Sequence, residues 1–277
     1  MKTKKKKNSR HLILILIAAA FLTIAAVFFV LMSIIDLFRL DTSYEGPSEE
    51  QMPEMNIYST DAFYRKNGLL YYKDSNYRSR AGVDVSTYQK KINWKKVYKA
   101  GIRFAMIRVG YSGRQTGRIH KDKRFEENIK GAVDAGLDTG VYFFSQAKTK
   151  KEAAKEARFV LRQIKGKNIT YPVAFDMEDT GGHDRHEDIS AETRTDIADV
   201  FCQIISNNGY EPMIYAYPDW VYNKVDYTQL TRYDMWLAHY TKRSSYPFHY
   251  RIWQYSNKGK IPGIKARTDL DIIFIRK

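Results

Sequence analysis

From Ala81 onward, short apolar runs alternate with stretches in which apolar residues recur every three or four positions. The short runs predict buried strands, and the longer periodic stretches predict amphipathic helices. Strands that alternate with helices favour a mostly parallel sheet, and eight of them favour a closed barrel. The pattern therefore predicts an α/β fold, an irregular TIM-like β/α barrel. Its eight expected strands lie at 82–85, 104–109, 139–144, 171–178, 212–216, 234–238, 250–255 and 270–275.

About five helices are expected, with the later ones short or missing. A short one covers 92–100, and a second runs from Phe125 until Gly136 stops it. A third carries its apolar residues between Ala153 and Ile164. The next begins after Ser190, a residue suited to cap a helix N-terminus, and ends at Asn208-Gly209.

The N-terminus has a different pattern. Residues 1–11 carry six Lys or Arg and no acid, and 12–35 is apolar except for Thr23 and Ser33. At ~1.5 Å per residue, a helix over 12–35 would be roughly 36 Å long and would cross a hydrocarbon core of about 30 Å. Basic residues before the span place the N-terminus in the cytoplasm. A cleaved signal peptide and a buried core helix are the alternatives, but the stretch exceeds a usual signal and no clear cleavage site follows.

Residues 36–80 read as an extracellular linker. The part from Asp41 to Asn56 is acidic and polar, with Gly46 and two prolines. The part from 57 to 80 is rich in tyrosine, and the sequence KNG at 66–68 predicts a turn. This part forms either a small hairpin against the main domain or an ordered part of a stalk. The expected divisions are a tail (1–11), a membrane helix (12–35), a linker (36–80) and a barrel (81–277).

Composition narrows the class of partner. Apolar residues make up 44% of the chain, enough for a core, and the net charge of +15 favours anionic partners such as lipid or a cell-wall polymer. Helix-turn-helix, RRM and zinc motifs are missing from the sequence, so no nucleic-acid partner is expected. Cys202 is the single cysteine, which excludes an intrachain disulfide and suits a small buried side chain.

The most informative stretch reads YPVAFDMEDT, from Tyr171 to Thr180. A short apolar run leads directly into Asp176 and Glu178, whose side chains share one face because side chains alternate along a strand. Glycoside hydrolysis needs two such carboxyl groups, one protonated and one charged. Two simpler interpretations remain open at this point: acids that complement a helix N-terminus, or half of a metal site.

Several further segments occur in a fixed order: GVDVSTYQ at 82–89, IRVGY at 107–111, AGLDTGVYFF at 135–144, PVAFDME at 172–178, PMIY at 212–215, MWLAHY at 235–240, IWQYS at 252–256 and TDLD at 268–271. In order and spacing the chain resembles glycoside hydrolase family 25, the Chalaropsis-type lysozymes or N-acetylmuramidases, from about residue 80 onward. The resemblance implies a β/α barrel that hydrolyses the β-1,4 bond between N-acetylmuramic acid and N-acetylglucosamine in peptidoglycan. It leaves open whether the charged partner attacks directly or assists the substrate's acetamido group.

The resemblance also implies roles for individual residues. Glu178 matches the general acid/base, Asp176 its charged partner, and Asp84 and Asp269 the flanking acids. The family usually has Asn where this chain has Asp271, so the role of that position is open. Asp269 precedes its apolar run whereas the other acids follow theirs, which is awkward for a barrel site unless the strand begins earlier than residue 270.

Aromatic residues near strand ends are candidates for stacking on sugar rings, with core packing as the alternative for each. The expected substrate-binding residues are Tyr142, Phe144, Tyr215, Tyr240, Trp253 and Gln254, and Trp236 is a weaker candidate. His183, His186, Glu187 and Asp188 offer metal-ligand types, but they lie in a polar stretch that favours a solvated loop. We therefore expect no metal and no cofactor.

Together these features predict a membrane-anchored lysozyme whose barrel faces the cell wall. Its expected partners are peptidoglycan glycan strands, membrane lipid through residues 12–35, and a wall-remodelling or transenvelope complex. The alternatives are a catalytically weak glycan-binding protein on the same barrel and a metal-dependent hydrolase that uses the same acids.

Overall fold

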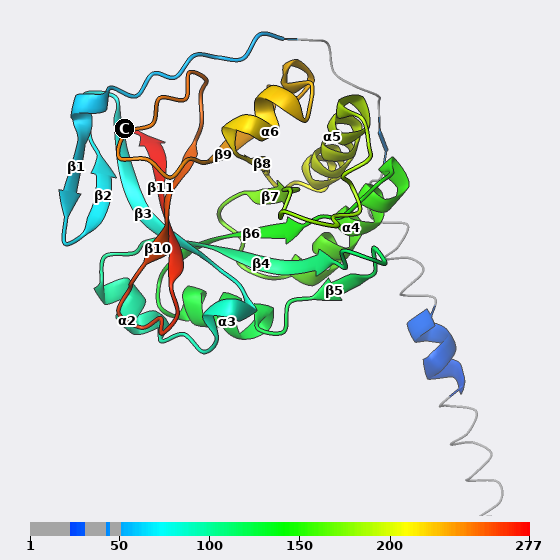
Figure 1. The fold of residues 1–277 in the computed structure, drawn as a ribbon. Helices are drawn as coiled ribbons and strands as arrows, with labels where there is room; N and C mark the ends of the chain where they lie inside the picture. Colours follow the sequence, from blue (N-terminus) through cyan, green and yellow to red (C-terminus); the bar gives the residue numbers. More distant parts are fainter. Residues whose placement is uncertain (1–22, 31–42, 45–50) are drawn as a thin grey trace, which may run out of the picture. The chain divides into compact units, whose positions relative to one another are not determined.

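The computed structural model describes residues 23–30, 43–44 and 51–277 (Figure 1). Residues 42–277 form one compact unit, and the helical residues 23–30, with exposed side chains, belong to another. Among these described residues, no helix has both the length and the apolar character needed to cross a membrane. The predicted tail at 1–11 and most of the predicted membrane helix at 12–35 lie outside the described residues.

Eight strands close into a barrel in the described part of the chain. They are β3 (Tyr77–Val85), β4 (Phe104–Ser112), β6 (Asp138–Phe144), β7 (Val173–Asp176), β8 (Pro212–Ala216), β9 (Asp234–Ala238), β10 (Ile252–Gly259) and β11 (Thr268–Arg276). Each pairs with the next in this order, and β11 pairs with β3 to close the ring. A further strand, β5 (Ile119–Lys121), extends the sheet beside β4. This confirms the predicted β/α barrel.

One strand runs against the others. The strands from β3 to β10 pair in parallel around the ring, whereas β11 is antiparallel to both β10 and β3. The start of β11 therefore lies at the rim where the other strands end. β11 begins at Thr268, earlier than predicted, and the register places Asp269 opposite Asp84. The position of Asp269 before its apolar run is thus consistent with a site at the carboxyl rim.

Five α-helices follow barrel strands in the described residues: α2 (Trp94–Lys99), α3 (Phe125–Asp134), α4 (Lys150–Ile164), α5 (Ala191–Asn207) and α6 (Pro218–Asn223). The first four match the predicted helices. The Ser190 side chain caps α5 by accepting a hydrogen bond from the Thr193 backbone NH at 3.1 Å. The sequence prediction did not locate α6, which begins with Pro218 two residues after β8. Short 3-10 helices occur at Thr60–Ala62 (η1), Thr87–Gln89 (η2) and Tyr227–Gln229 (η3).

The barrel interior is packed with side chains. Phe104, Met106, Trp236 and Ile252 belong to one buried cluster inside it. Gly82 is needed beside this cluster, because a Cβ at that position would lie 2.2 Å from the ring of Phe104. Since the centre of the barrel is filled, polar chemistry is confined to its ends.

A hairpin precedes the barrel and packs on it (Figure 1). Its strands, β1 (Phe63–Lys66) and β2 (Leu69–Tyr72), are joined by Asn67 and Gly68, both with positive φ, as in the two-residue turns that suit strand twist. The ring of Tyr58 stacks on Phe274 of β11 at 3.7 Å between centroids. Of the two alternatives for residues 57–80, the structure shows the hairpin against the main domain, and β3 itself begins before residue 81.

Candidate active site

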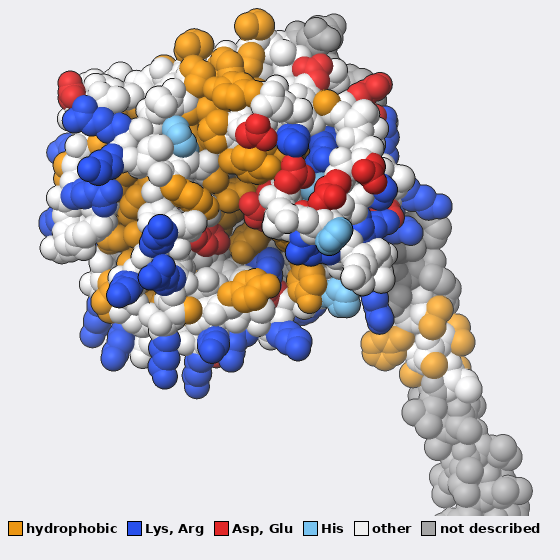
Figure 2. Space-filling view, viewed as in Figure 1, with side chains coloured by type: hydrophobic (Ala, Val, Ile, Leu, Met, Phe, Trp, Pro, Cys, Tyr) orange, Lys and Arg blue, Asp and Glu red, His pale blue; other side chains and the backbone are white. Residues whose placement is uncertain are grey.

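The acids singled out from the sequence meet at the carboxyl rim of the barrel. Asp84 lies near the end of β3, Asp176 is the last residue of β7, and Glu178 lies two residues beyond it. Asp269 and Asp271 lie at the start of β11. Their charges act on one another, because Asp269, Asp271 and Asp176 each raise the pKa of Asp84. Acidic side chains lie in and beside a hollow on the face shown in Figure 2.

Burial is the main cause of the raised pKa values at this rim. It raises the pKa of Asp84 and Asp271 well above the ordinary value, and the charge of Asp269 raises both further. Asp269 is less deeply buried, and burial raises its pKa to about 6. A buried carboxylate without a nearby cation is costly, so Asp84 and Asp271 tend to keep their protons, whereas Asp269 loses its proton more readily.

Asp176 and Glu178 differ in their surroundings. Burial raises the pKa of Glu178 to about 7, helped by the charges of Asp269, Asp184 and Asp179. Burial and the charge of Glu178 raise the pKa of Asp176 well above its ordinary value, and the guanidinium of Arg108 partly opposes this rise. Only Asp176 therefore has a cation that stabilises its charged form. When the two groups share one proton, we place it on Glu178 and the negative charge on Asp176.

Arg108 is a site residue that sequence reasoning missed. It lies on β4, is buried, and is held by Asp122, whose Oδ2 accepts from its Nε at 2.9 Å and lies 2.8 Å from its second guanidinium nitrogen. The available signal was a charged residue inside the apolar run of a predicted buried strand, since such residues are rarely buried without a partner.

Gln254 connects the aromatic residues to the acids. Its Oε1 accepts hydrogen bonds from the hydroxyls of Tyr215 at 3.1 Å and Tyr240 at 2.6 Å, and its Nε2 donates to Asp84 Oδ2. Two donors on the oxygen leave the amide nitrogen facing the carboxylate. The amide is therefore fixed in one orientation beside the acids.

Asp271 has a similar link to the barrel interior. Trp236 Nε1 donates to its Oδ1 at 2.9 Å. The Trp236 ring also meets Tyr142 and Tyr215 edge to face, at centroid distances of 5.8 and 4.9 Å. Asp271 is fully buried, so it supports the site from below the rim.

The predicted substrate-binding residues do not all lie beside the acids in the structure. Tyr142, Tyr215 and Gln254 are buried among the acids, Phe144 is the register partner of Asp176, and Tyr240 is half exposed. Trp253 does not join them: its ring is fully buried and lies against Phe63 of the hairpin, 5.5 Å between centroids. Trp253 neighbours Gln254 on β10, so its side chain points to the opposite face of the strand. Its position corresponds to the packing alternative.

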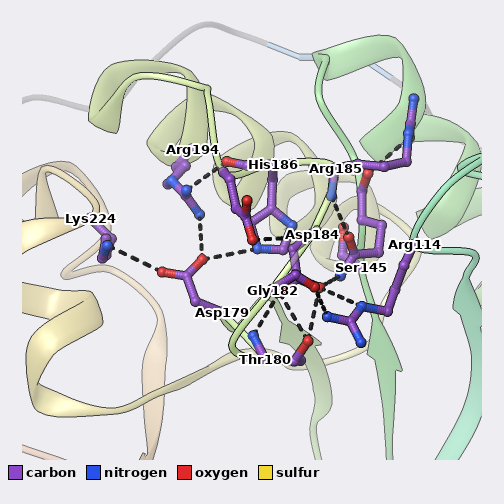
Figure 3. Close-up of polar contacts among 12 residues, drawn as sticks. Arg114, Ser145, Asp179, Thr180, Gly182, Asp184, Arg185, His186, Arg194 and Lys224 are labelled. Atoms are coloured by element: carbon purple, nitrogen blue, oxygen red, sulfur yellow. Dashed lines mark hydrogen bonds and ion pairs between the residues drawn. The ribbon is translucent and has the colours of Figure 1, made fainter.

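A buried network holds the loop that follows Glu178 (Figure 3). Asp184 accepts hydrogen bonds from the Thr180 backbone NH at 2.7 Å, from Arg114 Nε at 3.0 Å and from Gln146 Nε2 at 3.1 Å. Although burial raises the pKa of Asp184, these donors lower it below the ordinary value. Asp184 therefore stays charged and fixes the backbone immediately after the catalytic candidate.

Asp179 holds the other side of the same loop (Figure 3). Its carboxylate lies 3.2 Å from His186 Nε2, 3.5 Å from an Arg194 guanidinium nitrogen and 3.2 Å from Lys224 Nζ. The expected solvated loop is wrong for His186, which is fully buried, and burial followed by the charge of Arg194 lowers its pKa. Among the described residues, no cluster of three or more His, Cys, Asp or Glu side chains is arranged to hold a metal ion.

Comparison with known proteins decides the family. The sequence model of glycosyl hydrolases family 25 matches residues 83–264. The chain belongs to glycosyl hydrolase family 25. It is therefore a glycoside hydrolase, and the matched region contains Asp84, Asp176 and Glu178.

Curated relatives and solved structures agree with this family. Lysozyme M1 of Streptomyces globisporus is 28% identical over 199 residues, which cover 68% of this chain and 65% of that protein. A family 25 glycosyl hydrolase from Bacillus anthracis superposes with a TM-score of 0.60 at 21% identity, covering 82% of this chain and 94% of that chain. The modular autolysin LytC from Streptococcus pneumoniae gives 0.65 at 22% identity, and this chain spans about half its length. At these identities the two structures establish the family 25 fold.

Proposed function

We propose that this chain is a lysozyme that hydrolyses the β-1,4 bond between N-acetylmuramic acid and N-acetylglucosamine in peptidoglycan. Family membership and relatives named lysozyme and N,O-diacetylmuramidase support the substrate class. The observation that carries the proposal is the pair Asp176 and Glu178. Glu178 has a pKa of about 7, and the charged form of Asp176 is favoured by the positive charge of the buried Arg108.

In this proposal Glu178 is the general acid and base. A carboxyl with a pKa near 7 is protonated in about half of the molecules at neutral pH, and it gives this proton to the glycosidic oxygen as the bond breaks. Positive charge then develops on the sugar, and the carboxylate of Asp176 stabilises it. Glu178, now charged, takes a proton from the water that completes hydrolysis.

The remaining residues support this pair. Asp84 and Asp269 flank it, and the charge of Asp269 helps Glu178 to keep its proton. Gln254 and Tyr240 present fixed polar groups beside the acids, where sugar hydroxyls and acetamido groups would bind. Tyr142, Phe144 and Tyr215 are the remaining side chains proposed to line the sugar-binding site.

Digestion of purified peptidoglycan by the chain, followed by mass spectrometry, tests the activity. A lysozyme leaves new reducing ends on N-acetylmuramic acid, and new ends on N-acetylglucosamine would contradict the proposal. Glu178→Gln keeps the size of the side chain but loses the proton, so turnover should fall by about 10²–10⁴ while glycan binding remains. Turnover close to that of the unaltered chain in Glu178→Gln would instead favour a different acid, and no turnover in either chain would favour the glycan-binding alternative.

We also propose that residues 12–35 anchor the chain in the cell membrane, with the N-terminus in the cytoplasm and the barrel facing the wall. The basis is the basic run before 24 largely apolar residues. An anchored enzyme acts on membrane-proximal peptidoglycan, which suits wall remodelling or a transenvelope complex. Full-length protein should stay with membranes after a high-salt wash. A soluble mature form that begins after residue 35 would show a cleaved signal instead.

A further inference from the structure

A basic pocket lies between the hairpin and the barrel, outside the group of catalytic acids. It has a volume of about 450 Å³. Its basic lining residues are Arg65 from β1, Lys242 from the loop after β9, and Lys258 and Lys260 at the end of β10. None of the residues that line it is acidic. In the orientation shared by Figures 1 and 2 the hairpin lies at the left edge of the barrel, where basic side chains gather.

The pocket opens beside the catalytic acids. Tyr240 is one of its lining residues, and the hydroxyl of Tyr240 donates to Gln254, which in turn donates to Asp84. Leu270, another lining residue, lies between Asp269 and Asp271 on β11, so its side chain points to the opposite face of that strand from the two acids. Tyr240, whose side chain is half exposed, therefore connects the pocket to the acids, and a glycan bound to the acids would reach the pocket across it.

Contacts within the hairpin and to β10 position the hairpin wall of the pocket. The Leu70 backbone NH donates to the Tyr255 hydroxyl at 3.3 Å, and the Arg65 guanidinium donates to the Gly68 carbonyl at 3.3 Å. The same guanidinium lies 5.7 Å above the ring of Tyr255. These contacts hold one cation in place before any ligand arrives, which reduces the entropy lost on binding.

The chemistry of the lining defines the ligand. Four cations without a carboxylate among them repel one another, and a bound anion relieves this repulsion. The walls also contain apolar side chains, namely Leu69, Ile261 and Leu270, which are almost fully buried. The pocket therefore suits a small group that carries both a carboxylate and methyl or methylene groups. Peptides attached to peptidoglycan glycan strands have this composition.

We propose that this pocket binds a free carboxylate of the peptide attached to the glycan strand, and so makes the enzyme select peptide-bearing strands. The inference rests on the proposed lysozyme function. Arg65 and Leu69 belong to the hairpin, whereas the matched family region begins at residue 83. The hairpin thus adds a wall to the site that lies outside the matched region of the family.

Synthetic glycan oligosaccharides of one length test the proposal. One carries peptides with free carboxylates, a second carries the same peptides with every carboxylate capped as a methylamide, and a third carries the capped peptides and one sugar phosphate. At low salt the free carboxylates should raise kcat/KM roughly tenfold over the capped substrate, because each exposed ion pair contributes roughly 1.5- to 5-fold. Added salt should reduce this ratio, since it screens exposed charges.

The variant Lys242→Ala/Lys258→Ala/Lys260→Ala should lower the ratio to within about twofold. A matched variant that removes three exposed lysines elsewhere, Lys91→Ala/Lys95→Ala/Lys99→Ala, should keep it, which separates a local pocket from the overall charge. Equal hydrolysis of free and capped substrates by the unaltered chain would overturn the proposal while leaving the lysozyme function intact. So would an unchanged ratio in the first variant, or a preference for the phosphate substrate over the carboxylate substrate.

A measurement of binding tests the proposed pocket independently of turnover. Calorimetry with the full chain carrying Glu178→Gln measures the dissociation constants for the free and capped oligosaccharides. A tighter dissociation constant for the free carboxylates, lost in the three-lysine variant, would support the pocket even if no substrate were hydrolysed. Equal dissociation constants would overturn it.

Discussion

Asp84 and Asp269 are direct partners across the antiparallel pair of β3 and β11, the first and last strands of the barrel. The pairing is reinforced by the Thr268 hydroxyl, which donates to the Asp84 carbonyl at 3.0 Å. Two carboxyl groups thus face the site from the seam that closes the barrel. The charge of Asp269 raises the pKa of Glu178 across the rim, so the acidity of Glu178 depends on the seam.

Asp269→Asn should therefore lower the pKa of Glu178 from about 7, because one of the charges that raises it is removed. A general acid must be protonated, so its pKa sets the alkaline limb of activity. That limb should move to lower pH by up to about one unit. The pH dependence of kcat on a soluble oligosaccharide measures the shift. Asp61→Asn, an exposed acid on η1, serves as the control, and an unmoved limb in Asp269→Asn would mean that the two groups do not interact.

Asp184→Ala should loosen the loop that carries Glu178. The substitution leaves the Thr180 backbone NH and Gln146 without their acceptor, at a cost of about 1–3 kcal/mol in the free energy of unfolding. We expect kcat to fall more than KM rises, because the acid loses its position while the sugar contacts remain. Asp184→Asn retains an acceptor oxygen and should recover part of kcat. Equal losses of kcat in the two variants would indicate that the charge of Asp184 matters more than its hydrogen bonds.

The raised pKa of Glu156 should make the free energy of unfolding depend on pH. Glu156 is buried on α4, where the hydroxyls of Ser112 and Ser145 donate to it at 2.5 and 2.6 Å, and burial raises its pKa from 4.5 to about 7. Between these values the folded chain holds a proton that the unfolded chain has lost, so stability should fall as pH rises from about 5 to 7. The pKa shift of Glu156 should change the free energy of unfolding by about 3 kcal/mol over this interval, since one pKa unit corresponds to about 1.4 kcal/mol.

Urea unfolding at a series of pH values tests this prediction. Glu156→Gln cannot titrate, so its stability should decline less than that of the unaltered chain over the same interval. Glu192→Gln, at an exposed position in the first turn of α5, is the matched control. If Glu156→Gln and the unaltered chain showed parallel pH dependences, Glu156 would be charged in the folded state.

The hairpin gives a prediction about the boundary of the folding unit. A chain shortened to begin at Ile57 keeps β1, β2 and the whole of β3, and should be soluble and unfold cooperatively. A chain that begins at Ala81 loses Tyr77–Arg80, which pair with β11, and also the ring of Tyr58 that stacks on Phe274. Thermal unfolding should show a clearly lower Tm for the shorter chain. Equal Tm values would mean that residues 57–80 do not stabilise the barrel.

Much of the fold was predictable because each barrel strand is a short apolar run between polar turns. The position of Asp176 and Glu178 after such a run located the site for the same reason. Periodicity does not give strand direction, so the antiparallel course of β11 and its effect on Asp269 required the structure. The partners of Arg108 and His186 were also out of reach, since Asp122 and Asp179 lie in irregular segments whose course periodicity does not give.

The seam between β3 and β11 affects how the barrel folds during synthesis. A ribosome makes β3 early and β11 after every other strand of the barrel, and ring closure needs both. Until β11 emerges, a nascent chain holds Asp84, Asp176 and Glu178 but lacks Asp269 and Asp271. Such distant pairing is slow to form. We therefore expect hydrolytic activity to appear only after β11 has paired with β3, when Asp269 and Asp271 join the other acids at the rim.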